Sequence, residues 1–164
     1  IDCSSHNLKI DWDFQIVRAA VNVNYQQHQL MIEKIKNTLG DIKGKTIGVL
    51  GLSFKPNTDD MREAPSLTII KGMLDAGAKV KAFDPVAMEE AKKKMTDITY
   101  CDDTYAVAKD SDALIFITEW NQFRSLDMAK IKSLLKKPIV IDLRNIYEPK
   151  KMKQNGFTYV SVGR

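Results

Sequence analysis

The feature that most constrains the fold is a regular alternation of short apolar runs and helix-like segments from residue 45 to residue 163. Apolar runs of this length, bounded by turn residues, predict buried strands. Alternating strands and helices predict an α/β fold, here a Rossmann-like, doubly wound parallel sheet of about six strands with right-handed crossovers. We expect the strands at 45–52, 78–83, 98–101, 111–118, 137–143 and 157–163.

Helices are expected between these strands, and several carry start and stop signals. Pro65 suits a first helical position, and Gly77 lies just past the end of the same segment. Asp102 or Asp103 is expected to cap the third of these helices, and Ser125 the fourth. The helical segments are 65–76, 86–95, 104–110, about 126–136 and 148–153.

A long amphipathic helix is predicted before the first strand, over residues 13–39. Asp11 or Asp13 can cap its start, and Gly40 ends it. A helix of about 26 residues is about 39 Å long, and such a helix usually joins domains or packs against a partner subunit. We expect His28 to pack on its apolar stripe rather than to bind a metal. The stripe is Phe14, Val17, Val21, Tyr25, His28, Ile32, Ile35 and Leu39.

Two regions follow from this pattern: a helical region at 1–41 and an α/β domain at 42–164. The chain has 164 residues, a length typical of one domain with an appendage. Because it begins with Ile1 in the middle of a pattern, we expect it to be part of a longer protein.

Unusual side chains follow three of the predicted strands. In open α/β sheets, ligands bind beyond the carboxyl ends of the strands where the strand order reverses. With the order 3-2-1-4-5, that point lies between the first and fourth strands, with the fifth alongside. We therefore expect one ligand site at this edge. The residues that follow these strands are Phe54, Lys55 and an acid-rich loop to Arg62, then Thr118, Glu119, Trp120 and Phe123, and finally Arg144.

The physical chemistry of these side chains suits a phosphate-bearing ligand. Lys55 is a flexible point charge for a pyrophosphate, and Arg144 offers a planar fork for phosphate or hydroxyl oxygens. Phe54 can stack on a base or cover a ribose, or it can be a core aromatic. Arg62 can face a ligand or form a structural ion pair with Asp60 or Glu63. Trp120 and Phe123 are interpreted as packing residues.

A complete dinucleotide site within this domain is disfavoured. The fingerprint G-x-G-x-x-G should follow the first strand. The sequence has GVLGLSFK instead, with Gly48 and Gly51 but no third glycine. Asp84 resembles a ribose-binding acid, yet it lies 33 residues beyond Gly51, and Asp-Pro is also a good turn.

Composition excludes several other classes of function. The net charge is +4, and the lysine clusters are interleaved with acids, so we expect no nucleic-acid partner. No run of 18 apolar residues is present, which predicts no membrane span and a cytoplasmic protein. Cys3 and Cys101 are expected to be reduced thiols. No Ser-His-Asp set or metal cluster stands out, and Cys3 with its neighbour His6 is a poor candidate nucleophile.

Five ordered motifs carry a resemblance to a known family. GLSFKPNTDDMREAPS, AFDP, ITEWNQF, DLRNIYEP and GFTYVSVGR resemble the C-terminal part of the UDP-glucose/GDP-mannose dehydrogenase family. The segment FKPNTDDMRE most resembles that of family members that oxidise UDP-glucose. The N-terminal helix, with VNVNYQQ, resembles the helix that joins the two Rossmann-like domains of the family and builds a homodimer.

The resemblance implies an enzyme that oxidises the C6 alcohol of UDP-glucose to a carboxylate with two NAD. It implies that Phe54, Lys55 and Arg144 contact the nucleotide-sugar and that Arg62 reaches toward the NAD. The family's catalytic cysteine lies in a G-x-C-F-x-K-D segment that this sequence lacks, so we expect no catalytic residue here. The nucleophile and the NAD-binding domain are expected upstream of Ile1, and this chain alone is expected to be inactive.

Two other interpretations stay open. One is a sister enzyme that acts on a UDP-N-acetylhexosamine or on GDP-mannose. The other is a stand-alone regulatory module that binds a nucleotide-sugar.

Overall fold

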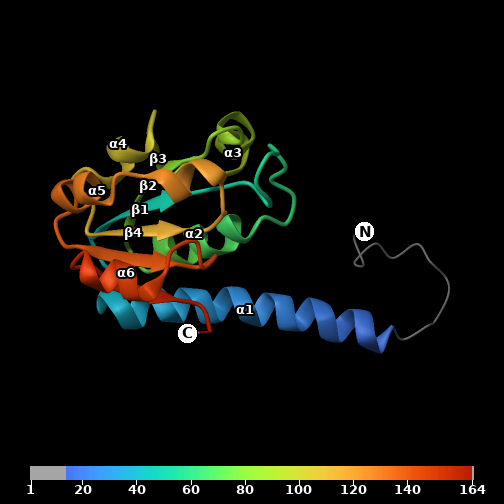
Figure 1. Cartoon of the computed structure of the whole chain (residues 1–164). Coiled ribbons are helices and arrows are strands. Elements are labelled where there is room, and N and C mark those ends of the chain that lie inside the picture. The colour runs from blue at the N-terminus through green and yellow to red at the C-terminus, as the bar shows by residue number, and fades with distance from the viewer. Residues whose placement is uncertain (1–13, 164) are drawn as a thin grey trace.

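A six-stranded, all-parallel sheet with helices on both faces forms the centre of the molecule (Figure 1). The computed structural model describes residues 14–163. The strands are β1 Thr46–Leu50, β2 Lys79–Phe83, β3 Thr99–Tyr100, β4 Ala113–Phe116, β5 Ile139–Asp142 and β6 Thr158–Ser161. Their order in the sheet is β3-β2-β1-β4-β5-β6, which confirms the predicted doubly wound fold and the order 3-2-1-4-5.

Two apolar cores fill the space between the sheet and the helices. The helices are α1 Gln15–Leu39, α2 Pro65–Asp75, α3 Met88–Lys94, α4 Thr104–Ala108, α5 Met128–Leu134 and α6 Pro149–Gln154. The first core joins α1, α2 and α3 to one side of the sheet. The second joins α4, α5 and α6 to the other side. The central strands β1 and β4 are therefore covered on both faces, as their continuous apolar runs predict.

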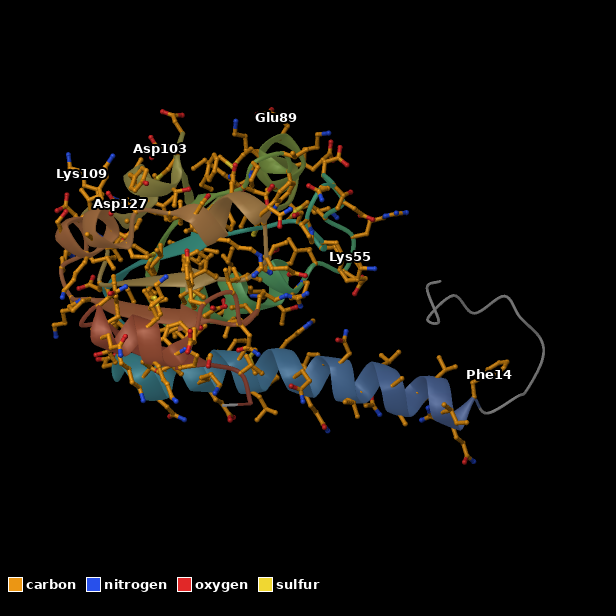
Figure 2. All side chains as sticks on the ribbon, viewed as in Figure 1. Phe14, Lys55, Glu89, Asp103, Lys109 and Asp127 are labelled. Atoms are coloured by element: carbon orange, nitrogen blue, oxygen red, sulfur yellow. The ribbon has the colours of Figure 1, made fainter. Side chains whose placement is uncertain are left out.

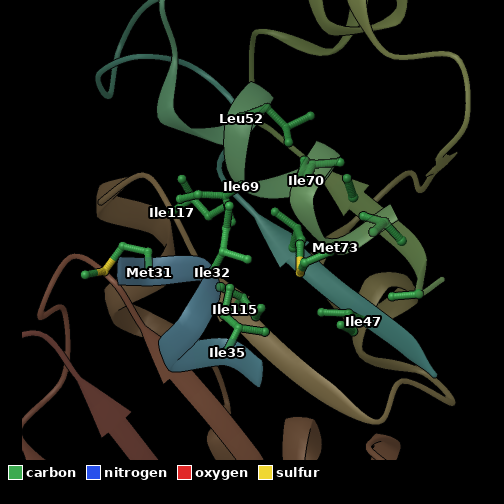
Figure 3. Close-up of a cluster of buried hydrophobic side chains, with 14 of the residues drawn as sticks. Met31, Ile32, Ile35, Ile47, Leu52, Ile69, Ile70, Met73, Ile115 and Ile117 are labelled. Atoms are coloured by element: carbon green, nitrogen blue, oxygen red, sulfur yellow. The ribbon is translucent and has the colours of Figure 1, made fainter. Parts of the chain in front are cut away.

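Only the C-terminal part of α1 packs on the domain. Met31, Ile32 and Ile35 are buried against α2 and the sheet, as Figure 3 shows. The close approach of the two helices depends on Gly72, because a Cβ added there would lie 2.5 Å from Cδ1 of Ile32. Lys34 adds a hydrogen bond from its ammonium to the carbonyl of Ser161 at 2.9 Å. This half of α1 is thus fixed to the α/β domain.

The N-terminal half of α1 projects beyond the domain on the side toward which the strands point (Figure 1). Its apolar side chains stay exposed, including Phe14 at 61% and Ile16 at 87%. His28, on the predicted stripe, is half-buried, and burial lowers the pKa of its imidazole. A solvent-exposed apolar face of this length is unusual in a monomer.

Several predicted helix ends need correction. Residue 14 is the N-cap of α1 and provides no side-chain cap, while Asp11 and Asp13 lie outside the described residues. Ser125 does not cap α5. It ends a short 3-10 helix, Asn121–Ser125, where its hydroxyl donates to the carbonyl of Gln122.

Asp127 caps α5 instead and accepts a hydrogen bond from the Lys130 amide at 3.0 Å. The helix therefore starts two residues later than predicted. Between the two open choices at α4, Asp103 is the cap, with bonds from the amides of Tyr105 and Ala106 at 2.7 and 2.8 Å.

Candidate functional site at the strand ends

The three strands expected to bear the site end at the same level of the sheet. Leu50 of β1 is paired with Phe116 of β4, and Phe116 is paired with Asp142 of β5. The loops that follow these strands therefore leave from one edge, as predicted. Lys55 lies at this edge, on the same side as the projecting half of α1 (Figure 2).

A close contact locks the β1 loop to the β4 loop. Gly51 has φ +87°, and a Cβ added there would lie 2.6 Å from the backbone nitrogen of Thr118. The Thr118 hydroxyl then donates to the carbonyl of Ser53 at 2.6 Å. Glycine is required because no side chain fits between these two chain segments.

Phe54 and Lys55 form the exposed tip of the β1 loop. The Phe54 ring is 42% exposed, so the core alternative for this residue is wrong. The Lys55 ammonium lies 5.4 Å from the centre of that ring. Among residues 14–163, this ring is the only partner of the ammonium, which leaves its charge available to an anion.

Arg62 is exposed and held by one acid of the same loop. Its guanidinium donates to both oxygens of Asp60, with distances between 2.8 and 3.3 Å. The same carboxylate accepts a bond from the Arg62 amide at 2.9 Å. These bonds lower the pKa of Asp60 to about 2. The ion pair is the structural alternative raised above, yet the Arg62 side chain remains 85% exposed and points to solvent.

Arg144 is paired across the edge with Glu119, which follows β4. Two bonds join the guanidinium to the carboxylate, with Nε to Oε2 at 2.6 Å and Nη2 to Oε1 at 2.8 Å. These bonds lower the pKa of Glu119 and raise the pKa of Arg144. Because only one edge of the guanidinium is used, Nη1 remains directed away from Glu119.

Trp120 and Phe123 are buried, as expected for packing residues. The Phe123 ring packs edge-on against Phe116 with the ring centres 5.9 Å apart. The Trp120 indole nitrogen donates to Asp84 at 3.2 Å. These aromatic residues pack beneath the strand-end loops and do not present a ring face to solvent.

The arrangement disfavours a complete dinucleotide site in this domain. Gly51, where a pyrophosphate would need close backbone approach, is packed against Thr118. Asp84 has no exposed surface, and its carboxylate accepts bonds from residues on both sides of β2, so no ribose hydroxyl can reach it. The described residues therefore do not fit NAD as a resident group at this edge.

Two buried carboxylates are functional candidates that the sequence reasoning missed or underestimated. From the sequence, Asp84 is either a ribose contact or a turn residue. Asp142, the last residue of β5, accepts bonds from the amides of Arg144 and Tyr147 and from the Tyr159 hydroxyl. The available signal was their position, because Asp142 is the acid that ends the otherwise apolar β5 and Asp84 is the acid that directly follows β2.

Other features of the described residues offer no competing chemistry. The Cys101 thiol is half-buried, and burial raises its pKa, which disfavours a thiolate nucleophile. Cys3 lies outside the described residues. Within 14–163, no cluster of three potential metal ligands is present. No helix in that range has both the length and the apolar character needed to cross a bilayer.

Neither of the two surface pockets described next contains all the candidate residues of the strand-end edge. A groove of about 580 Å³ lies between α5 and α6 and contains none of Phe54, Lys55, Arg62 or Arg144. A shallower hollow of about 400 Å³ is lined by Arg62 and its loop, together with Glu90 and Lys94 of α3. Open α/β sheets bind ligands at the carboxyl ends of their strands, so the strand ends are the candidate site and the larger groove is not.

Fold and edge together define a Rossmann-like α/β protein whose strand-end loops carry one lysine and two arginines, each arginine paired with a carboxylate. Residues 48–149 match the UDP binding domain of the UDP-glucose/GDP-mannose dehydrogenase family. The chain belongs to this family. The match includes all three strand-end loops described above.

Similar proteins support the same assignment. The chain is 44% identical over 155 residues to a UDP-glucose 6-dehydrogenase of Rhizobium meliloti, and 40% identical over 154 residues to TuaD, a UDP-glucose 6-dehydrogenase of Bacillus subtilis. These alignments cover 94% and 93% of this chain but only 36% and 33% of the two relatives. The chain thus spans about a third of the length of the curated relatives it matches.

A solved structure shows the same fold. A UDP-glucose dehydrogenase from the archaeon Pyrobaculum islandicum superposes with a TM-score of 0.73 at 32% identity. The alignment covers 89% of this chain and 32% of that protein.

Proposed function

We propose that this chain is the nucleotide-sugar-binding portion of a UDP-glucose 6-dehydrogenase, which oxidises UDP-glucose to UDP-glucuronate with two NAD. The observation that carries this proposal is the match of residues 48–149 to the family's UDP binding domain, because it spans all three strand-end loops. Relatives with the name UDP-glucose 6-dehydrogenase favour glucose as the sugar.

Three residues are assigned to the UDP-sugar. Lys55, whose charge has no carboxylate partner among residues 14–163, pairs with the diphosphate. The exposed Phe54 ring beside it covers the apolar side of the ligand. Arg144 uses the part of its guanidinium that Glu119 leaves unpaired to bind phosphate or hydroxyl oxygens.

NAD is assigned to another part of the protein. The edge described above does not fit NAD, and the family's cysteine segment is missing from this sequence. Arg62 is the one residue assigned to the cofactor, because its exposed guanidinium points to solvent and can reach a ligand held by a second domain. If a second domain covers the strand-end edge, this also explains why the edge is open in this chain.

The projecting half of α1 is assigned to a homodimer. Its apolar side chains are exposed over several turns, and burying them against a second copy supplies about 25 cal/mol per Å² of apolar surface. This half of α1 and the strand-end edge lie on the same side of the molecule (Figure 1).

The proposal is tested by NADH formation with UDP-glucose, a UDP-N-acetylhexosamine and GDP-mannose as substrates. The full-length protein is expected to reduce NAD with UDP-glucose, and residues 1–164 alone are expected to give no NADH. Turnover by residues 1–164 contradicts the assignment of catalysis to another part of the protein.

A preference for an acetylated hexosamine favours the sister enzyme. A solved NDP-N-acetyl-D-galactosaminuronic acid dehydrogenase from Methanosarcina mazei, 26% identical with a TM-score of 0.71, is the observation behind this second candidate.

A further inference from the structure

One buried carboxylate, that of Asp84, forms hydrogen bonds with two loops of the strand-end edge. Asp84 follows β2 and has no exposed surface. Its Oδ2 accepts bonds from the Leu52 amide at 2.7 Å, the Ser53 amide at 3.0 Å and the Ser53 hydroxyl at 3.1 Å. It also accepts the Trp120 indole N–H at 3.2 Å. One oxygen atom thus joins the loop after β1 to the loop after β4.

The second oxygen of Asp84 anchors the start of the next helix. Oδ1 accepts bonds from the amides of Val86 and Ala87 at 3.0 and 2.8 Å. In every hydrogen bond of its side chain, Asp84 is therefore the acceptor. A carboxylate can accept all of them, whereas an amide side chain would turn an N–H₂ group toward two or more N–H donors.

The backbone of residues 52–54, just before Lys55, is fixed by hydrogen bonds. Asp84 takes the amides of Leu52 and Ser53, and Ser66 and Thr118 donate to the carbonyls of the same two residues. The Phe54 amide donates to the carbonyl of Asp60 at 2.8 Å. Beyond this fixed segment, the side chains of Phe54 and Lys55 extend into solvent.

We infer that Asp84 is a positioning residue for the UDP-sugar site: it fixes the backbone that presents Phe54 and Lys55 to the diphosphate. Fixing this segment in the free protein lowers the ordering cost that a ligand would otherwise meet on binding. The ligand part of this inference rests on the proposed function, while the ordering of the loop is a property of the chain alone.

The test compares Asp84→Asn with Asp112→Asn. Asp112 provides a matched control, because its carboxylate accepts the Thr46 amide at 2.8 Å at the opposite end of β1. The probe is UDP, with its Kd measured by calorimetry on the full-length protein. Amide hydrogen exchange at Leu52 and Ser53 reports on the loop, and the melting temperature reports on global stability.

We expect Asp84→Asn to raise the Kd for UDP about tenfold or more, the change that corresponds to one charged hydrogen bond. The amide exchange rates of Leu52 and Ser53 should rise well above the rate set by global unfolding of the protein. Asp112→Asn should lower the melting temperature without changing the Kd. An unchanged Kd in a folded Asp84→Asn protein overturns the inference, as does a loss of affinity that Asp112→Asn reproduces at equal stability.

A double-mutant cycle tests whether Asp84 acts through Lys55. The Kd change caused by Asp84→Asn should be smaller in a Lys55→Ala background, since one of the two residues that it positions is then absent. Fully additive changes contradict the inference.

If Asp84→Asn does not fold, Ser53→Ala removes a single donor to the same oxygen and should give a smaller change in the same direction. Failure of the wild-type protein to bind UDP contradicts the proposed function instead. In that case hydrogen exchange still decides whether Asp84 orders the loop.

Discussion

Lys55 is the residue at which the proposed site is most easily tested. Its ammonium contacts only the Phe54 ring within the described chain, so replacing it with alanine breaks no internal ion pair. We predict that Lys55→Ala weakens UDP-glucose binding by about 1.5–3 kcal/mol, the usual range for a hydrogen bond to a charged group.

Calorimetry on the full-length protein measures this change. Lys71→Ala is the control, because Lys71 is an exposed lysine of α2 that pairs with Asp75 away from the strand ends. An equal loss in both variants would indicate a general effect of surface charge.

The pair of Glu119 and Arg144 predicts a pH dependence of stability. Arg144 lowers the pKa of Glu119 below its usual 4.5 in the folded protein. A depressed folded pKa gives stability that is complete above 4.5 and is lost as the pH falls through the lowered value. Because both side chains are partly exposed, we expect about 0.2–1 kcal/mol.

Urea unfolding of wild type and Glu119→Gln measures this contribution. The variant should be less stable at pH 7, and the difference should shrink as the pH falls below 4.5 through the lowered pKa of Glu119, because the wild-type carboxyl is then protonated. Glu148→Gln, which removes an exposed acid elsewhere, should show no such convergence. A difference that is constant with pH would contradict the assigned role of the pair.

At the scale of elements, the two adjacent acids before α4 make a matched pair. Asp103 accepts two amide bonds at the helix start, and no side-chain bond of Asp102 is found among the described residues. We predict that Asp103→Ala lowers the free energy of unfolding by about 1 kcal/mol, whereas Asp102→Ala leaves it nearly unchanged. Chemical denaturation measures both, and equal effects would refute the cap.

The element order could be predicted from sequence because buried strands and amphipathic helices have different apolar periods. The strand order was predicted as well, and β1 and β4 do meet at the centre of the sheet. Helix starts were predicted less well. Ser125 and Asp127 are both good caps by residue type, and only the local path of the chain, a 3-10 turn before Leu126, decides between them.

The exposed residues of the candidate site could be placed at strand ends from the sequence. The residues that hold them in position could not be predicted. Phe54, Lys55 and Arg144 follow strand ends and carry recognisable chemistry. The role of Asp84 depends on contacts with Leu52, more than 30 positions away in sequence, which no local pattern encodes. The partner of Arg144 likewise comes from another loop, 25 residues earlier.

At the scale of the whole molecule, the projecting half of α1 predicts the oligomeric state. Val21 is 57% exposed in the middle of the apolar stripe. A glutamate there would have to be buried unpaired in a dimer, whereas in a monomer it would face water. We predict that Val21→Glu shifts a dimer toward monomer and leaves the melting temperature of the α/β domain nearly unchanged.

Analytical ultracentrifugation at several concentrations tests this prediction. Asn22→Glu places the same charge on the neighbouring residue, off the stripe, and should leave the dimer intact. A monomeric wild-type protein, or equal dissociation by both variants, would remove α1 from the interface.

The central claim is that the loops after β1, β4 and β5 form one site for the UDP moiety. The most direct measurement is a titration of the isotope-labelled protein with UDP, in which backbone amide shifts are followed by nuclear magnetic resonance. If these loops bind UDP, the shifts cluster at residues 52–56, 118–120 and 144. Shifts that cluster instead in the groove between α5 and α6, or a protein that shows no shifts with UDP, would contradict this claim.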